Sequence, residues 1–398
     1  MSKVTNLVIT VYLMALVMIA CTPSFAGYQQ TEESDNSEQV AVVHTSTTTP
    51  FAPDLADVNP TSMTPSATET QVPLPETTGV SAELNPLTGL FVEDPTILDR
   101  RPVLIKVSNY PASLRPHSGL SYADLVWEYF IGNGMTRFLA LYYGQDAAQV
   151  GPVRSGRLVD GQLVRLYGGY LGMVGADRFV WSVIGKQLPG RIVSEKPTTC
   201  PPICRVGNTF SVFADSGAFT YYVQTQELDN QRPDLGGMVF DEWVPDGGKP
   251  ATNLRIYFSY YNQIGWDYDP ESGLYLRLQE VVQDDNTIIL EPMPDCLTGE
   301  QLAFENVIML FAPHEVLKPE LVDIDVWSAD GARAIFFRDG RLYEGTYSAP
   351  STDTPLHFFD AEGNSYRLKP GNTWFMILGT KSIVEEVEEG VWKGRFYP

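Results

Sequence analysis

Residues 125–143 read LVWEYFIGNGMTRFLALYY, and this stretch predicts a β-hairpin. Two runs rich in aromatic and β-branched residues, 125–131 and 135–143, flank a Gly-Asn-Gly turn at residues 132–134. A tight turn of this kind needs positive φ angles, which glycine and asparagine adopt with little strain. We therefore expect the amino-terminal half of the chain to contain a β-sheet built around this hairpin.

Strand and helix signals alternate on either side of the hairpin. The run VLIKV at residues 103–107 is bounded by polar and turn residues, as expected of a buried strand. Residues 158–167 carry apolar side chains near helical spacing, and a Gly-Gly break at 168–169 separates them from another apolar run at 170–174. A strand, a helix and a strand in this order predict an α/β layer.

The second half of the chain has a different pattern. Proline and glycine are frequent between residues 231 and 250, which predicts a connector and a domain boundary there. Short apolar runs separated by turns then follow, with few helical stretches. The predicted fold class is a mixed α+β fold, with an α/β domain at 85–230 that contains a central sheet and the hairpin, and a mainly antiparallel β domain at 251–398.

The first 21 residues predict a secretion signal. An apolar run at residues 7–20 follows a short polar start and is too short to span a bilayer as a helix. Residues 18–21, MIAC, have the form of a lipoprotein cleavage site, and an ordinary signal-peptidase site after Ala26 is the alternative. A lipidated Cys21 would anchor the chain to the cell membrane, on its extracytoplasmic face.

Residues 22–84 predict a disordered, acidic tether. The segment holds no lysine or arginine, nine aspartates or glutamates, and many threonines, serines and prolines. Such a composition cannot bury enough apolar surface to form a core, and its like charges keep it extended. The segment would hold a folded part away from the membrane.

The charge of the whole chain argues against a nucleic-acid partner. With 27 basic against 49 acidic residues, the formal net charge is −22, which opposes binding to nucleic-acid phosphates. The sequence contains no His-Glu-x-x-His motif, no phosphate-binding loop and no dinucleotide-binding fingerprint. We therefore predict no nucleic-acid partner, no cofactor and no metal site, and expect contact with the membrane through the lipid anchor.

Two cysteines are close enough in the sequence to form a bridge. Cys200 and Cys204 flank Pro-Pro-Ile, and in an oxidising compartment this spacing permits a small disulfide loop. Metal binding by these two cysteines is the weaker interpretation, because the second pair of ligands that a zinc site needs is missing.

Several segments resemble one bacterial family. These segments are NPLTGL at 85–90, RPHSGL at 115–120, GMTRF at 134–138, GPVRSGR at 151–157, FRDG at 337–340, and the stretches 266–277 and 368–374. In them the chain resembles the YerB-like lipoproteins, and the resemblance extends from residue 85 to about 380. It implies an envelope lipoprotein with an amino-terminal and a carboxy-terminal domain of unknown function, without supplying a reaction.

The chain departs from the family pattern at two places. Where the resemblance leads us to expect His-Ala-Gly-Gly-Ser, residues 173–177 read MVGAD, and where it leads us to expect Pro-His-Asn, residues 206–208 read VGN. Both histidines are absent. Any chemistry or metal binding that these histidines perform in relatives is lost here, whereas a packing role would change little.

An arginine cluster is the first candidate for ligand binding. Arg154 and Arg157, with Arg165 further along, lie in and after a proline-containing turn that precedes the predicted helix. Guanidinium groups beside exposed backbone N–H groups at a helix start bind carboxylate or phosphate well. The alternative is that these arginines neutralise nearby carboxylates such as Asp160 and Asp177.

The carboxylates of the hairpin allow two interpretations. Glu128 and Arg137 lie in the two strands of the hairpin, near enough for a cross-strand or diagonal ion pair. In the functional alternative, Asp124 or Glu128 acts with Asp177 as an acid and base pair, which requires that burial raise one carboxyl pKa.

These observations predict a binding protein whose ligand is an anionic or glycan component of the cell envelope, or an envelope protein. The alternative is an envelope-directed hydrolase or transferase with a carboxylate and arginine site. The ligand-binding candidates are Arg115, Arg137, Arg154, Arg157, Asp177 and Asn208, and the acid or base candidates are Asp124 and Glu128.

Overall fold

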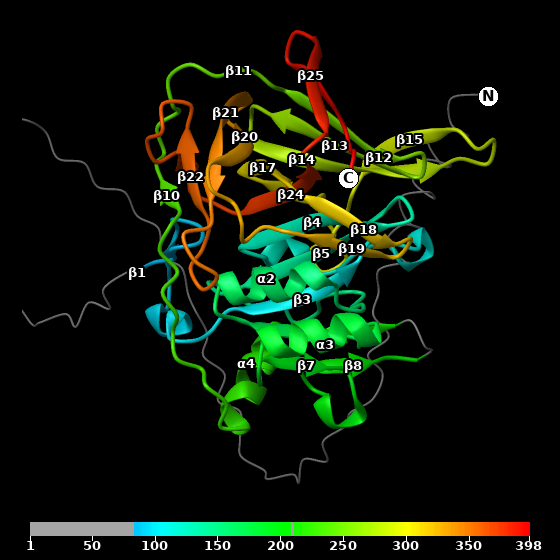
Figure 1. Cartoon of the computed structure of the whole chain (residues 1–398), viewed down its shortest axis with the longest axis vertical. Coiled ribbons are helices and arrows are strands. Elements are labelled where there is room, and N and C mark those ends of the chain that lie inside the picture. The colour runs from blue at the N-terminus through cyan, green and yellow to red at the C-terminus, as the bar shows by residue number, and fades with distance from the viewer. Residues whose placement is uncertain (1–82, 208–210) are drawn as a thin grey trace, which may run out of the picture. The chain divides into compact units, whose positions relative to one another are not determined.

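A computed structural model describes residues 83–207 and 211–398 of the chain (Figure 1). The described residues belong to one compact unit. The predicted signal peptide, Cys21, residues 22–82 of the predicted tether, and Asn208 lie outside the described residues. The last two residues of the predicted tether form strand β1 (Glu83–Leu84), which pairs with β2 (Phe91–Val92).

Within the described residues, an eleven-stranded mixed sheet forms the centre of this unit. In order across the sheet its strands are β11 (Lys249–Pro250), β21 (Arg341–Ser348), β20 (Ala332–Arg338), β17 (Asn306–Ala312), β24 (Thr373–Gly379), β4 (Leu125–Gly132), β5 (Met135–Tyr142), β3 (Val103–Ser108), β6 (Tyr170–Met173) and β7 (Ile192–Ser194), and β22 (His357–Asp360) also pairs with β21. The neighbours β17, β24 and β4 are parallel, and so are β3, β6 and β7, whereas the other pairs are antiparallel.

A second, seven-stranded sheet comes from the carboxy-terminal part of the described chain. Its strands are, in order, β15 (Ile288–Pro292), β14 (Leu274–Val282), β13 (Asn262–Asp269), β12 (Asn253–Ser259), β26 (Val391–Arg395) and β25 (Ile383–Glu388), with β16 (Ala303–Phe304) paired to β14. All pairs are antiparallel except β12 with β26.

Helices and short strand pairs complete the described part. The α-helices are α2 (Leu158–Leu166), α3 (Arg178–Gln187) and α4 (Ser216–Thr225). The short pairs are β8 (Ile203–Arg205) with β9 (Val212–Ala214), β10 (Val239–Phe240) with β23 (Arg367–Leu368), and β18 (His314–Lys318) with β19 (Leu321–Ile324); the 3-10 turns are η1 (Pro95–Leu98), η2 (Ala112–Leu114), η3 (Leu120–Tyr122) and η4 (Pro197–Thr199). None of these helices is both long and apolar enough to cross a lipid bilayer.

Both faces of the main sheet are covered, which explains why its strands are so apolar. Side chains alternate between the faces, and the two resulting cores are separate clusters of buried residues. Helices α2 and α3 and strand β19 cover one face, whereas α4 and the seven-stranded sheet cover the other (Figure 1). Strands that are buried on both faces appear in the sequence as continuous apolar runs without polar alternation.

The hairpin prediction is confirmed, and so is the helix that follows it. Strands β4 and β5 pair antiparallel across the turn, where Asn133 has a φ of 49° and Gly134 a φ of 74°. The predicted helix at 158–167 is α2. The predicted mixed α+β class agrees with the two sheets and the three α-helices of the described residues, in which strands predominate.

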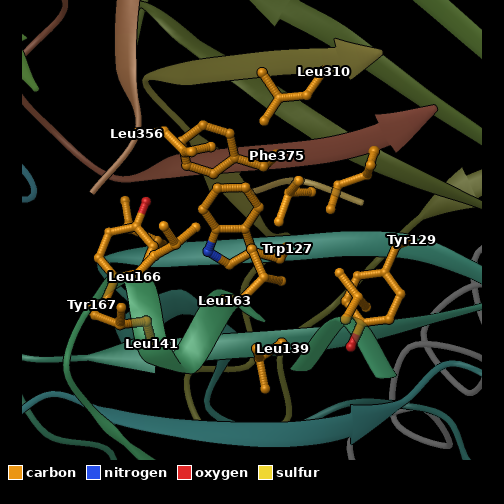
Figure 2. Close-up of a cluster of buried hydrophobic side chains, with 14 of the residues drawn as sticks. Trp127, Tyr129, Leu139, Leu141, Leu163, Leu166, Tyr167, Leu310, Leu356 and Phe375 are labelled. Carbon is orange, nitrogen blue, oxygen red and sulfur yellow. The ribbon is translucent and has the colours of Figure 1, made fainter. Parts of the chain in front are cut away.

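Strands from both predicted domains contribute to the main sheet. Strand β24, near the carboxyl terminus, lies between β17 and the hairpin strand β4 and is parallel to both. Trp127 of β4 stacks on Phe375 of β24, with ring centroids 4.0 Å apart, in the core beneath α2 (Figure 2). Residues 85–230 and 251–398 therefore share the main sheet and both of the cores on its faces.

Candidate functional site

The structure brings three of the predicted ligand-binding arginines together around a buried lysine. Arg137 on β5 is electrostatically coupled to Arg154, Arg157 and Asp160, and Lys106 on β3 to Arg137, Arg157 and Asp160. We call Lys106, Arg137, Arg154 and Arg157, with Tyr129 and Asp160 between them, the cationic site. It carries four cationic side chains against one carboxylate, in a chain whose net charge is −22.

The fold places this site at the carboxyl ends of parallel strands. The segment 153–157 runs past the end of β3, where the backbone N–H of Arg154 donates to the Lys106 carbonyl at 2.9 Å. On its other side, the N–H of Val174, just after β6, donates to the Arg154 carbonyl at 3.0 Å. Helix α2 begins directly after Arg157. Strand ends of this kind, next to a helix amino terminus, are where open α/β sheets commonly bind anions.

A buried trio forms the inner part of the cationic site. The Lys106 ammonium lies 3.2 Å from Oδ1 of Asp160 and 4.0 Å above the centre of the Tyr129 ring. The Tyr129 hydroxyl is hydrogen bonded to both the lysine and the aspartate. Oδ2 of Asp160 also accepts from the backbone N–H of Arg157 at 2.6 Å, so this carboxylate caps α2 as well.

Burial controls the protonation of this trio. It lowers the pKa of Lys106 to about 7, although the Asp160 carboxylate opposes the shift. The positive charges of Arg137 and Arg157 act in the same direction as burial. Burial raises the pKa of Tyr129 well above its usual value, so the phenol keeps its proton. Lys106 is therefore able to gain or lose a proton near neutral pH, beside a phenol that does not ionise there.

Arg137 and Arg157 have N–H donors that form no hydrogen bond with the described residues. Nη1 of Arg137 donates to the Ser155 carbonyl at 2.7 Å, and Nη1 of Arg157 donates to the Gly156 carbonyl at 3.2 Å. The Nε atoms of both residues are buried and have no hydrogen-bond partner among the described residues. Neither guanidinium forms an ion pair with a carboxylate in the described part of the chain. Burial and the Arg157 charge lower the pKa of Arg137 to about 9. An anionic ligand would relieve this repulsion.

The predicted ion pair between Glu128 and Arg137 is wrong. Glu128 lies directly opposite Phe138, and Arg137 lies opposite Tyr129, so the two charged side chains point to opposite faces of the sheet. Glu128 instead accepts from Arg277 of β14 at 3.0 Å, from the Trp374 indole at 3.2 Å and from Thr136 at 2.9 Å. Its carboxylate is fully buried between the two sheets, and burial raises its pKa.

The other predicted acid or base residues lie in separate environments. Asp124 is buried and accepts from the Asn85 side chain and from the backbone N–H groups of Tyr143 and Gly144. Burial raises its pKa to about 6 against these hydrogen bonds. Asp177 is exposed and caps α3 by accepting from the N–H of Phe179 at 2.8 Å. The three carboxylates thus have different partners, and none of these partners is shared.

The remaining predicted residues form ion pairs or a disulfide bond with other parts of the fold. Arg115 forms an ion pair of 2.7 Å with Glu280 of β14, and its guanidinium lies over the Tyr110 ring. Cys200 and Cys204 are joined by a disulfide bond. Arg165 binds Asp353 at 2.6 Å, away from the cationic site. In the described residues there is no group of three or more histidine, cysteine, aspartate or glutamate side chains that could hold a metal ion.

The segment that lacks the expected histidine borders the cationic site. The N–H of Gly156 donates to the Gly175 carbonyl at 2.9 Å, which places residues 173–177 against the turn that carries the arginines. The second departure, at residues 206–208, includes Asn208, which is outside the described residues.

Comparison with known proteins identifies the family of this chain. Residues 87–230 match the model of the N-terminal domain of a protein of unknown function, DUF3048, and residues 254–375 match its C-terminal domain. A protein of Bacillus subtilis (strain 168), described as "Putative lipoprotein YerB", is 27% identical over 319 residues, which are 74% of this chain and 85% of that protein. The crystal structure of the YerB protein from Bacillus subtilis has a TM-score of 0.61 at 24% identity, over 74% of this chain and 96% of that chain. The chain belongs to the two-part, YerB-like DUF3048 family.

Proposed function

We propose that this chain is a lipoprotein of the cell envelope, anchored through Cys21 on the extracytoplasmic face of the membrane, that binds an anionic envelope component at the cationic site. The name of the Bacillus subtilis relative supports the lipoprotein assignment. The segment MIAC at residues 18–21 supports the position of the anchor.

The observation that carries the binding role is the pair Arg137 and Arg157. The Nε atoms of both side chains are buried without a hydrogen-bond partner, and neither guanidinium forms an ion pair with a carboxylate within the described residues, although the chain has 22 more acidic than basic residues. Two adjacent guanidinium groups with unused donors fit the planar, two-point recognition of a carboxylate or a phosphate group. Lys106 adds a third cation behind them.

Binding to purified envelope sacculi tests this role. The full chain, purified from membranes in detergent, is compared with the variant Arg157→Gln, and we expect about tenfold weaker binding when one charge-assisted contact is lost. Competition with inorganic phosphate and with acetate separates a phosphate ligand from a carboxylate ligand.

Arg178→Gln is the matched control for this experiment. Arg178 is exposed at the start of α3 and forms no ion pair in the described residues, so this variant changes the net charge by the same amount outside the cationic site. Equal binding by the Arg157→Gln and Arg178→Gln variants would rule out the cationic site as the place of binding.

One observation favours a hydrolase or transferase as a second candidate function. Lys106 has a pKa of about 7 and contacts a phenol and a carboxylate next to the arginines, and such groups transfer protons in active sites. Mass spectrometry of fragments released from sacculi distinguishes the candidates. Release by the wild type but not by Lys106→Met would identify an enzyme, whereas binding without release would leave a binding protein.

A further inference from the structure

A cavity whose lining shares no residue with the cationic site opens beside strand β21. It has a volume of about 1360 Å³ and is lined by the loop that follows β10, by residues 342–344 near the start of β21 and by the residues from the end of β22 to β23. We call it the Trp243 cavity after its most exposed aromatic residue. The loop at 241–248 lies in the segment whose proline and glycine content predicted a plain connector.

Hydrogen bonds from the main sheet hold this loop in place. The buried Arg338 of β20 donates to the carbonyls of Asp241 at 3.0 Å and of Trp243 at 3.3 Å. The hydroxyl of Tyr343 donates to the Pro245 carbonyl at 2.9 Å. The Trp243 side chain nevertheless remains 84% exposed. An exposed indole on a braced backbone is available to a ligand without the entropic cost of ordering a loop.

The charge around the cavity is negative and largely unneutralised. Asp246, Glu344 and Glu362 line the cavity, are exposed, and form no ion pair within the described residues. Of the two basic residues in the lining, Arg367 is bound to Asp241 at 2.6 Å, and Lys249 lies over the Trp392 ring. This lining repels anions and attracts cations.

A buried phenol supplies an independent sign of a missing partner. Tyr366 lines the same cavity, is 4% exposed, and stacks on Phe336 with ring centroids 4.0 Å apart. Its hydroxyl is buried and has no hydrogen-bond partner among the described residues. Buried hydroxyl groups are normally hydrogen bonded. A phenol oxygen is able to accept a hydrogen bond from an ammonium or guanidinium group.

We propose that the Trp243 cavity binds a cationic segment of a protein partner through its lysine or arginine side chains. The indole face of Trp243 attracts a cation by its quadrupole, and the three carboxylates neutralise the charge. This preference is opposite to that of the cationic site, so the two sites take different ligands and this proposal stands independently of the proposed function.

The test measures binding of a capped hexalysine peptide to the full chain by calorimetry at about 0.15 M salt, where long-range attraction to an acidic protein is screened. We expect Trp243→Ala to weaken binding by about fivefold, because the cation–π contact is lost without a change of net charge. The control is Trp181→Ala on α3, whose side chain is 41% exposed and lies outside the lining of the cavity. Equal affinities of the two variants would overturn the proposal.

The carboxylates are tested with a second matched pair of variants. The double variant Glu344→Gln/Glu362→Gln should bind hexalysine about threefold more weakly than Glu385→Gln/Glu388→Gln, which removes two exposed charges from β25 instead. Because all four residues are exposed, neither variant should disturb folding. Equal binding by the two double variants would contradict the proposal.

An uncharged oligosaccharide tests whether the cavity binds a glycan instead of a cationic polypeptide. Aromatic faces also bind sugar rings, so a hexamer of N-acetylglucosamine is tested with the same four variants. Binding of this hexamer that depends on Trp243, combined with no Trp243 dependence for hexalysine, would assign the cavity to a glycan and overturn the proposal of a cationic polypeptide.

Discussion

His117 is a buried side chain whose environment opposes its positive charge. It is 1% exposed, its Nε2 lies 2.7 Å from the Ser108 carbonyl, and its Nδ1 has no partner among the described residues. Burial lowers its pKa to about 3, and the charges of Arg115 and Arg277 act in the same direction. The folded protein therefore holds a neutral imidazole in a pH range where the unfolded chain takes up a proton.

The resulting pH dependence is testable with His117→Gln. Because the folded pKa lies below the unfolded value of 6.5, the folded state binds fewer protons between pH 3 and 6.5, so stability falls as the pH decreases through that range. We expect the free energy of unfolding of the wild type to fall relative to that of the variant by about 1.4 kcal/mol per pH unit there. Urea titrations of both proteins at several pH values measure this difference. Parallel pH profiles would show that His117 does not contribute.

Residue types alone predicted only part of the cationic site. Arg154 and Arg157 were recognisable because basic residues are few in this chain. Lys106 carried a visible signal, since it interrupts an apolar strand that is buried on both faces. Its partner Asp160 belongs to another element, and the sequence separation of 54 residues gives no information on their contact. The predicted ion pair of Glu128 with Arg137 is wrong because side chains on a strand alternate between the two faces of the sheet. A shift of one residue in the pairing therefore places the two side chains on opposite faces.

At the scale of the secondary-structure elements, the hairpin turn is tightly constrained by its backbone conformation and by a close contact. Gly134 has a φ of +74°, and a Cβ at this position would lie 2.7 Å from the Cβ and Oγ of Ser259 on β12. The turn therefore contacts the second sheet closely, and the Ser259 hydroxyl donates to the Gly134 carbonyl at 2.8 Å. Glycine is needed here for both its backbone conformation and its lack of a side chain.

Replacing Gly134 by alanine should be costly for this reason. We expect Gly134→Ala to lower the free energy of unfolding by about 2–3 kcal/mol, the sum of backbone strain and close contact. Gly190→Ala is the matched control, because Gly190 has a φ of +72° and no atom within 4 Å of an added Cβ. It should cost about 1 kcal/mol, from backbone strain alone. Equal losses in the two variants, measured by chemical denaturation, would mean that the contact with Ser259 is unimportant.

Local patterns predicted elements but could not predict which strands are neighbours. The hairpin follows from turn chemistry and the helix α2 from apolar spacing, because both depend on residues close in the sequence. The pairing of β4 with β24 joins residues that are about 250 positions apart, such as Leu125 and Thr373. Strands that are apolar on both faces carry no period that specifies a partner, so many pairings are compatible with the sequence.

At the scale of the whole molecule, one buried ion pair links the two sheets. Glu128 of the main sheet and Arg277 of the second sheet are both fully buried, and the guanidinium lies 5.1 Å from the centre of the Trp266 ring and 5.2 Å from that of Trp374. A charge left unpaired in such a place is strongly unfavourable, whereas an apolar pair of similar size is tolerated.

A double-mutant cycle measures this coupling. We expect Glu128→Gln alone to lower the free energy of unfolding by about 3–5 kcal/mol, because Arg277 remains buried without the carboxylate with which it forms its ion pair. Adding Arg277→Met should recover part of that loss, which gives a coupling energy of at least about 1 kcal/mol. Additive effects of the two substitutions in urea denaturation would show that the ion pair does not couple the sheets.

Because the main sheet takes strands from both halves of the chain, neither half on its own can complete it. Residues 83–230 without the rest would leave an edge of β4 unpaired and would expose Trp127, which is buried against Phe375. Residues 231–398 alone would leave the same edge of β24 open and would lose the partner of Arg277. Long, apolar, unpaired strand edges promote aggregation instead of folding.

We therefore expect neither segment to fold by itself and the two to assemble when they are produced together. Residues 83–230 and 231–398 are expressed separately and together, and thermal unfolding is followed by circular dichroism. The separate segments should show no cooperative transition, whereas the co-expressed segments should co-purify and unfold in a single transition, because the β4–β24 pairing and the core around Trp127 form only when both are present. Cooperative unfolding of residues 83–230 alone would instead support an independent amino-terminal domain with a boundary at the predicted connector, 231–250. In that case the contacts across β4 and β24 would act as an interface between two domains, and Trp127→Ala would weaken their association without unfolding either one.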